Sequence, residues 1–169
     1  MRRSAVYILL GVLLAGCMAE ERERADPSRR AMDALIAFAR APSDATWTAV
    51  PLAESVDLGL ADVFYLRLSA RQLRNPRAWT LSVDGFRGRA GSASAVALIA
   101  AEDGRLRVTR GPHRHCAAPP EPEPPQVTPL ERVVVQPRDA DGCLDWWTVD
   151  AFVDDEGKIR AVTLDLWEP

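Results

Sequence analysis

The sequence has few of the residues that most often carry out chemistry. Its 169 residues include two histidines, three cysteines and one lysine, Lys158. It has no Gly-x-Ser-x-Gly elbow, no Ser-x-x-Lys pair, no His-Glu-x-x-His helix and no glycine-rich phosphate loop ahead of a predicted helix. These absences exclude the usual signatures of serine hydrolases, zinc peptidases and nucleotide-binding enzymes, and we expect no cofactor.

The sequence also has no excess of positive charge. The net charge is −3, and removing Arg2 and Arg3 with a signal peptide would make it −5. Nucleic-acid binding needs a clustered basic face, so we expect no nucleic-acid partner. The same charge balance disfavours an electrostatic attachment to anionic lipid.

No apolar run reaches the length of about 20 residues that a membrane-spanning helix needs. The most apolar stretch, residues 5–14, follows a start with two arginines and leads into Leu14-Ala15-Gly16-Cys17. A positive start, a short apolar core and small residues before a cleavage site are typical of a secretory signal peptide. We therefore predict that residues 1–16 are a cleaved signal peptide.

The tetrapeptide Leu14-Ala15-Gly16-Cys17 resembles the lipobox of bacterial lipoproteins. The resemblance implies that Cys17 is lipidated, with palmitate-type acyl chains, and that the protein is anchored to the cell membrane with its domain on the extracytoplasmic side. An ordinary signal peptide with an incidental cysteine is the alternative. The whole chain resembles small lipoproteins of high-GC, actinobacterial-type bacteria, and this likeness implies no activity.

Removing the signal peptide leaves enough chain for one domain. Residues 17–25 are expected to be the lipidated cysteine and a charged tether, and residues 26–169 a single extracytoplasmic domain. Within it, residues 117–129 are a proline-rich segment, with six prolines among thirteen residues. Because proline cannot donate to a strand ladder, we expect this segment to be an extended, exposed loop.

The first element of the domain is predicted to be a helix. Asp26 is a good N-cap and Pro27 a good first helical residue, and the helix should end near Arg40 because Pro42 follows. Apolar residues recur at helical spacing between these limits. They are Met32, Leu35, Ile36, Phe38 and Ala39.

Beyond this helix the apolar pattern changes to a period of two, which predicts strands. A short helical turn is expected at residues 69–73, before Asn75-Pro76. The apolar run at residues 96–100 is interpreted as a strand that turns into the next one through Glu102-Asp103-Gly104. The expected strands are residues 64–68, 79–83, 96–100, 106–109 and 133–135.

The clearest hairpin lies at the C-terminus. Residues 147–153 and 159–167 each alternate apolar and other side chains, and Asp154-Asp155-Glu156-Gly157 forms the turn between them. The fold class is therefore α+β, with one N-terminal helix packed on an antiparallel sheet of about six to eight short strands. This pattern is similar to the cystatin-like arrangement of a helix on a curved sheet. An all-β sandwich with a peripheral helix is the alternative.

Two cysteines besides Cys17 remain, Cys116 and Cys143, and in an oxidising compartment they are expected to form a disulfide. His113 and His115 lie within three residues of Cys116, and in a strand both would point to the same side. A zinc or copper site could use these three residues. The spacing fits no closed zinc pattern and a disulfide would occupy Cys116, so we expect no metal.

Two aspartates interrupt the apolar strands of the C-terminal hairpin, Asp150 and Asp165. We expect both on the solvated face of the sheet. In the alternative they lie near each other across the hairpin, where the proximity of like charges raises a carboxyl pKa and creates an acid–base pair.

Neighbouring residues of a strand point to opposite faces, so Trp146 and Trp147 cannot share one core. One of them is covered by the N-terminal helix or a loop, or else it is exposed. An exposed tryptophan is a typical anchor for a partner. Trp146, Trp147 and Trp167 are therefore our candidate binding surface for an envelope protein or a glycan.

Together these patterns predict an envelope-anchored lipoprotein whose domain is a non-enzymatic binding or accessory module, and no catalytic residue is assigned. The expected partners are the membrane, through the lipid anchor, and an envelope protein or glycan. The alternative function is a metal-binding protein or a metal-dependent hydrolase that uses His113 and His115.

Overall fold

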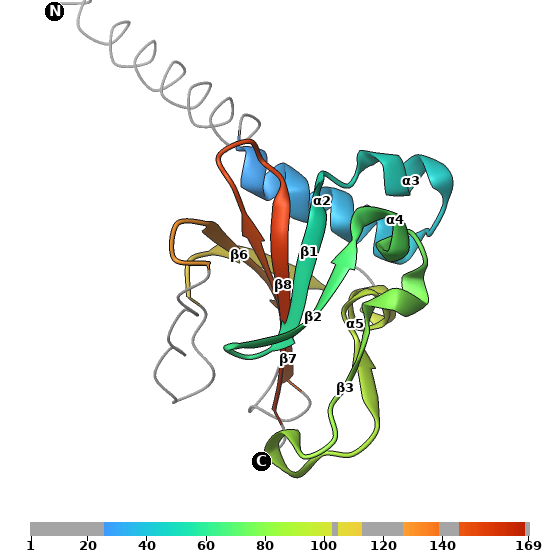
Figure 1. Cartoon of the computed structure of the whole chain (residues 1–169), viewed down its shortest axis with the longest axis vertical. Coiled ribbons are helices and arrows are strands. Elements are labelled where there is room, and N and C mark those ends of the chain that lie inside the picture. The colour runs from blue at the N-terminus through green and yellow to red at the C-terminus, as the bar shows by residue number, and fades with distance from the viewer. Residues whose placement is uncertain (1–25, 103–104, 113–126, 139–145, 168–169) are drawn as a thin grey trace, which may run out of the picture.

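The computed structural model describes residues 26–102, 105–112, 127–138 and 146–167. These residues form an α+β structure in which helices cover one face of a sheet (Figure 1), and the predicted fold class is confirmed. The helices are α2 Pro27–Arg40, α3 Asp44–Ala49, α4 Ala70–Leu73 and α5 Ala95–Ala101, with 3-10 turns η1 Pro76–Trp79 and η2 Phe86–Gly88. The strands are β1 Leu52–Leu60, β2 Val63–Ser69, β3 Thr80–Ser82, β4 Ser92–Ser94, β5 Leu106–Arg110, β6 Glu131–Pro137, β7 Trp146–Val153 and β8 Ile159–Trp167.

Six strands form one sheet in the order β2-β1-β8-β7-β6-β5, and β3 and β4 form a separate two-stranded sheet. Four pairings in the large sheet are antiparallel, as expected. The pairing of β1 with β8 is parallel, so the sheet is mixed. Parallel strands need a long connection, and here almost the whole domain connects the two.

The predicted N-terminal helix is confirmed with its boundaries. The side chain of Asp26 accepts hydrogen bonds from the N–H groups of Ser28 and Arg29, and Pro27 occupies the first turn. The apolar face of α2 packs on β6 and β7 and against α5. Its buried hydrophobic residues are Ala31, Met32, Leu35, Phe38 and Ala39.

The start of α2 is also fastened to the far edge of the sheet. Arg110 of β5 forms ion pairs with Asp26 and with Glu131 of β6, the second at 3.2 Å. The Ser28 hydroxyl donates to the same Glu131 carboxylate. These contacts fix the first turn of the helix on β5 and β6.

The apolar run at residues 96–100 is a helix, so the predicted strand there is wrong. Ser94 caps α5 by accepting from the N–H of Ala97, and Ala95, Val96 and Ile99 are buried. A short apolar run does not distinguish a buried strand from a buried helix by periodicity. Packing against α2 decides the matter here. The predicted helical turn at residues 69–73 is confirmed as α4, capped by Ser69.

The C-terminal hairpin is confirmed, and alternate residues of β7 and β8 face the helices as expected. Gly157 has φ 78°, a left-handed conformation that suits glycine. Asp154 accepts from the N–H groups of Glu156 and Lys158 and from the Arg160 side chain. Burial by itself raises the pKa of Asp154, but these hydrogen bonds outweigh it and hold the pKa below its usual value.

The sheet has two distinct ends. We call the end next to Pro27 and the β7–β8 turn the Pro27 end, and the end with the β1–β2 turn the hairpin end. Gly157, in the β7–β8 turn, packs directly against Pro27, where α2 begins. Since β1 runs parallel to β8, Leu52 pairs with Ile159 near this end and Leu60 pairs with Leu164 farther along. The five residue steps from Ile159 to Leu164 correspond to about 17 Å along β8, at about 3.3 Å per residue. The β1–β2 turn therefore lies at the other end of the sheet from the start of α2 (Figure 1).

Candidate functional site

The β1–β2 hairpin forms one edge of the large sheet. A two-residue turn at Ala61 and Asp62 joins the strands, and Ala61 has φ 49°, as hairpin turns of this length require. Val63 and Tyr65 are 57% and 50% exposed, and they are the exposed large hydrophobic side chains among the described residues. The hairpin edge therefore presents apolar surface to solvent.

A β-bulge determines which way each side chain of β2 points. The register shifts between Leu58 and Gly59, which leaves Tyr65 outside the regular alternation. Leu66 then packs against the main core, whereas Phe64 packs on the opposite face of the sheet. Gly59 is required because a Cβ at this position would overlap the carbonyl group of Val63.

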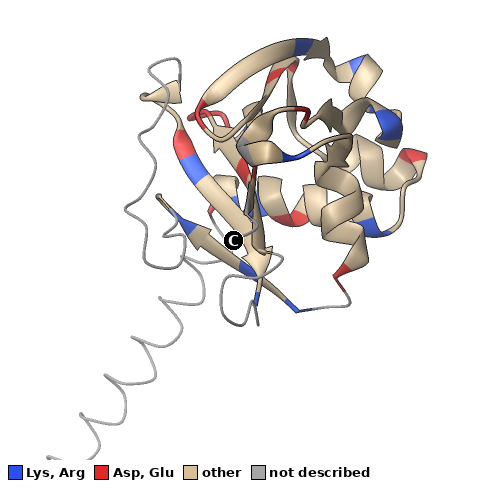
Figure 2. Cartoon of the chain, turned by 90° about the horizontal axis from the view of Figure 1, so that it is seen from below, with Lys and Arg blue, Asp and Glu red and all other residues tan. Residues whose placement is uncertain are grey.

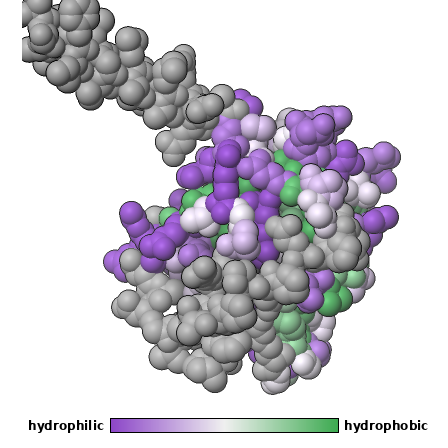
Figure 3. Space-filling model, turned by 90° about the vertical axis from the view of Figure 1, so that its left-hand side faces the viewer, coloured by the Kyte–Doolittle hydropathy of each residue, from purple (hydrophilic) through white to green (hydrophobic). Residues whose placement is uncertain are grey.

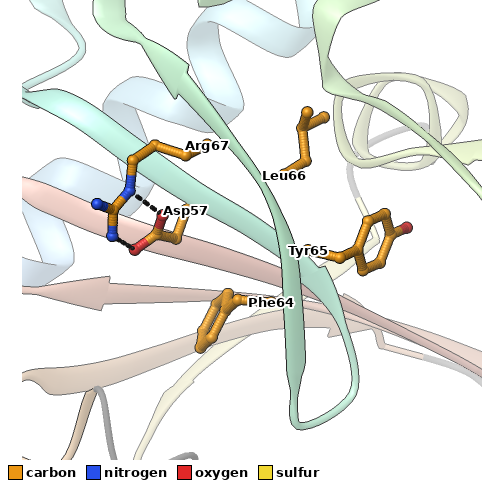
Figure 4. A pocket seen from close by; sticks show the side chains of 5 residues that line it. All are labelled: Asp57, Phe64, Tyr65, Leu66 and Arg67. Carbon is orange, nitrogen blue, oxygen red and sulfur yellow. Dashed lines mark hydrogen bonds and ion pairs between the residues drawn. The ribbon is translucent and has the colours of Figure 1, made fainter.

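A pocket of about 320 Å³ lies along this edge, lined by Asp57 and by four consecutive residues of β2, Phe64 to Arg67 (Figure 4). Arg67 donates to both carboxylate oxygens of Asp57, at 2.6 and 2.8 Å, and these hydrogen bonds and the charge of Asp57 raise the pKa of Arg67. Tyr65 points the other way, and its hydroxyl donates to the carbonyl of Ser82 at 3.1 Å. Partial burial raises the pKa of Tyr65.

A second group of polar residues lies at the centre of the sheet, on the face opposite α2. We call it the buried polar layer, and it consists of Arg132, Thr148, Asp150, Thr163 and Asp165. Arg132 donates from Nε to Asp150 Oδ2 at 2.7 Å, and its guanidinium group lies 5.6 Å from the centre of the Phe152 ring. Exposure is 6% for Arg132 and 1% for Asp150.

The expectation that Asp150 and Asp165 lie on a solvated face is wrong, because both are buried. In the β7–β8 register Asp150 is opposite Thr163 and Thr148 is opposite Asp165, so the aspartates are diagonal neighbours, as in the alternative. Asp150 forms an ion pair with Arg132. This ion pair gives Asp150 a structural role, and the acid–base alternative stays a prediction.

Both neighbouring tryptophans are buried, with Trp146 5% and Trp147 6% exposed. Trp147 belongs to the main core, and Trp146 points to the other face, where it is covered. The candidate surface of exposed tryptophans is therefore wrong for these two residues. Trp167 ends β8, and its side chain lies outside the described residues.

Several predicted sites fall outside the described residues: Cys17, His113, His115, Cys116, Cys143 and most of the proline-rich segment. The lipid anchor, the disulfide and the metal alternative therefore stay predictions. Within the described ranges, no three His, Cys, Asp or Glu side chains are placed to hold a metal ion. Val127, in the proline-rich segment, is buried against Phe152 and Ala161, so that segment is not exposed throughout.

Sequence reasoning missed Arg132, Val63 and Tyr65. Arg132 directly precedes the apolar run Val133–Val135, and this position was a sequence signal for a charged residue inside a buried strand. Val63 and Tyr65 had no such signal, because alternation alone does not tell an edge strand from a central one.

The described surface mixes charges and small apolar patches. Acidic and basic residues are interspersed over the helices and strands (Figure 2). Among the described residues visible in Figure 3, most are hydrophilic, with small hydrophobic patches between them. None of the described helices is both long and apolar enough to cross a membrane. Comparison with protein families, with curated proteins and with solved structures finds no match to this chain.

Proposed function

We propose that this protein is a lipid-anchored component of the cell envelope whose domain is a non-enzymatic binding or accessory module. The observation that supports a binding role is the apolar hairpin edge. Val63 and Tyr65 are both at least half exposed beside a pocket of about 320 Å³. Exposed apolar surface next to a pocket is characteristic of interaction sites, so the partner docks at the hairpin edge.

The two ends of the sheet suit this arrangement. If Cys17 carries the lipid, the eight residues from Met18 to Ala25 span at most about 28 Å between the membrane and α2. The Pro27 end then faces the membrane. The hairpin end lies at the opposite end of β8 and points away from the lipid, toward other envelope components.

The anchor is tested by metabolic labelling of the full-length protein with a fatty-acid analogue. We expect label on the wild type and none on the Cys17→Ala variant, which also moves to the soluble fraction. Cys143→Ala is the matched control, because it removes a cysteine but not the lipobox. Label that persists in Cys17→Ala contradicts the anchor.

The binding role is tested by photo-cross-linking in the envelope. A photoreactive residue replaces Asp62, next to the exposed side chains, and cross-linked partners are identified by mass. Changing Val63 and Tyr65 together to Thr keeps strand propensity but removes the apolar surface. We expect the cross-link to be lost. Changing Arg107 to Thr on the opposite edge strand is the control, and equal loss in both variants contradicts docking at the hairpin edge.

A further inference from the structure

Along the outer edge of β2, backbone groups have no backbone partner within the part of the chain that the structure describes. β2 is the last strand of the sheet, and no backbone hydrogen bond joins residues 63–68 to any described residue outside β1. The N–H of Ser69 donates to the Gln72 side chain, so it points away from β1. Groups alternate along an antiparallel strand, so the N–H and C=O of Arg67, two residues earlier, point to the same open edge.

The pocket lies against this edge. The cavity is lined by the four residues from Phe64 to Arg67 and by Asp57 of the neighbouring strand β1, so it follows the part of β2 that contains Arg67. None of the residues of β2 is buried. Arg67 itself is exposed, so this part of the strand is accessible from solvent.

We propose that an extended segment of a partner protein adds to β2 as a further strand, an inference that rests on the proposed binding function. Unpaired N–H and C=O groups along an edge are satisfied best by the backbone of another strand. The added strand would place alternate side chains over Leu66 and Leu68, which are partly buried and apolar. The partner segment is accordingly free of proline and has apolar residues at alternate positions.

The bulge at Tyr65 limits what can pair here. It interrupts the edge, which is one way in which proteins prevent indiscriminate strand addition. The regular part of the edge is then the short stretch of residues 66–68, next to the exposed ring of Tyr65. A short backbone template beside an aromatic side chain favours a specific partner over general aggregation.

A second copy of this chain is a poor occupant. Two β2 strands that pair in antiparallel fashion are related by a twofold axis perpendicular to the strand. That axis would point the two Pro27 ends in opposite directions. Two chains anchored by Cys17 in one membrane need both Pro27 ends on the same side, so the partner is a different protein.

The test compares Arg67→Pro with Arg67→Ala in the full-length protein, using the cross-link from position 62. Both variants lose the ion pair with Asp57, but only proline removes the N–H that faces the partner. Proline is tolerated at such an edge position. We expect the partner to bind Arg67→Pro about tenfold more weakly than Arg67→Ala, which corresponds to one backbone hydrogen bond. Hydrogen exchange of the Arg67 amide in the wild type should slow when the cross-linked partner, in purified form, is added.

Equal binding by the two Arg67 variants, or an Arg67 amide that the partner does not protect, overturns strand addition. If the double variant with Thr at positions 63 and 65 still loses the cross-link in that case, docking at the hairpin edge stands although strand addition does not. If this double variant also binds the partner normally, the proposed binding function fails as well. A cross-link between two copies of this chain also overturns the proposal. So does a cross-link from position 62 to residues 18–25 of the same chain.

Discussion

Strands β7 and β2 belong to one sheet but differ in which of their side chains are buried and which are exposed. All eight residues of β7 are buried, and two of them, Thr148 and Asp150, are polar. None of the seven residues of β2 is buried, and two of its exposed side chains, Val63 and Tyr65, are large and hydrophobic. Charge is thus enclosed at the centre of the sheet, while apolar surface is left at its edge.

The comparison shows that buried charges and exposed apolar side chains are tolerated for different physical reasons. A buried charge is tolerated when a partner of opposite sign and further hydrogen bonds accompany it, as Arg132 accompanies Asp150. An exposed apolar side chain costs little stability by itself. Substitutions at the centre of the sheet should therefore change the stability of the fold, and substitutions at the edge should change partner binding.

The largest effect is expected from Arg132→Ala. Removing the arginine leaves the Asp150 carboxylate buried without its ion-pair partner, which should lower the free energy of unfolding by about 3–5 kcal/mol. Urea denaturation measures the change. Changing Arg132 to Met and Asp150 to Leu together removes both charges and should recover a large part of the loss. An Arg132→Ala variant as stable as the wild type would erase the contrast between centre and edge.

Gly59→Ala should have the next largest effect, about 1–3 kcal/mol. The added methyl group overlaps the carbonyl of Val63, so the hairpin must shift. Ser55→Ala, at an exposed position of the same strand, is the matched control and should change stability little. If Gly59→Ala matches this control in thermal unfolding, the bulge is not held by close approach of the two strands.

Asp154→Asn should lower stability at neutral pH by about 1–2 kcal/mol, through weaker hydrogen bonds to the β7–β8 turn. The folded-state pKa of Asp154 is below its unfolded value, so its contribution is present above about pH 3.9 and is lost as the pH falls through the folded pKa. The wild type and the variant should thus converge in acid. Asp155→Asn, at the exposed next residue, is the control, and a difference that widens in acid would reverse the sign of the argument.

The smallest effect on stability is expected at the edge. Changing Val63 and Tyr65 together to Thr should lower the free energy of unfolding by only about 1 kcal/mol, mainly because the hydrogen bond from the Tyr65 hydroxyl to the Ser82 carbonyl is lost, although the same variant should lose the partner. Urea denaturation beside the envelope cross-link separates the two effects. A loss of several kcal/mol would mean that these side chains stabilise the fold, and the contrast with the centre would disappear.

Local sequence signals predicted the elements whose ends are marked by caps and turns. Asp26 and Pro27 start α2, and the turn from Asp154 to Gly157 makes the C-terminal hairpin, because each signal acts within a few residues. The run at residues 96–100 has no breaker inside it and suits a strand or a helix equally. Its packing against α2 decides for the helix.

The candidate site was less predictable than the fold. Whether a strand is central or at an edge depends on which strands pair, and the parallel pairing of β1 with β8 joins segments about 100 residues apart. That pairing leaves β2 at the edge and exposes Val63 and Tyr65. The second face of the sheet is likewise covered, so that Asp150, Asp165 and Trp146 are buried.

By itself the sequence determined the α+β class, the first helix, the C-terminal hairpin and the lipobox resemblance, since all of these depend on short-range patterns. The tertiary structure alone decided which polar residues are enclosed and which apolar residues face solvent. Both outcomes depend on contacts between distant segments, and the alternation within one strand cannot tell whether each of its faces meets water or another part of the protein.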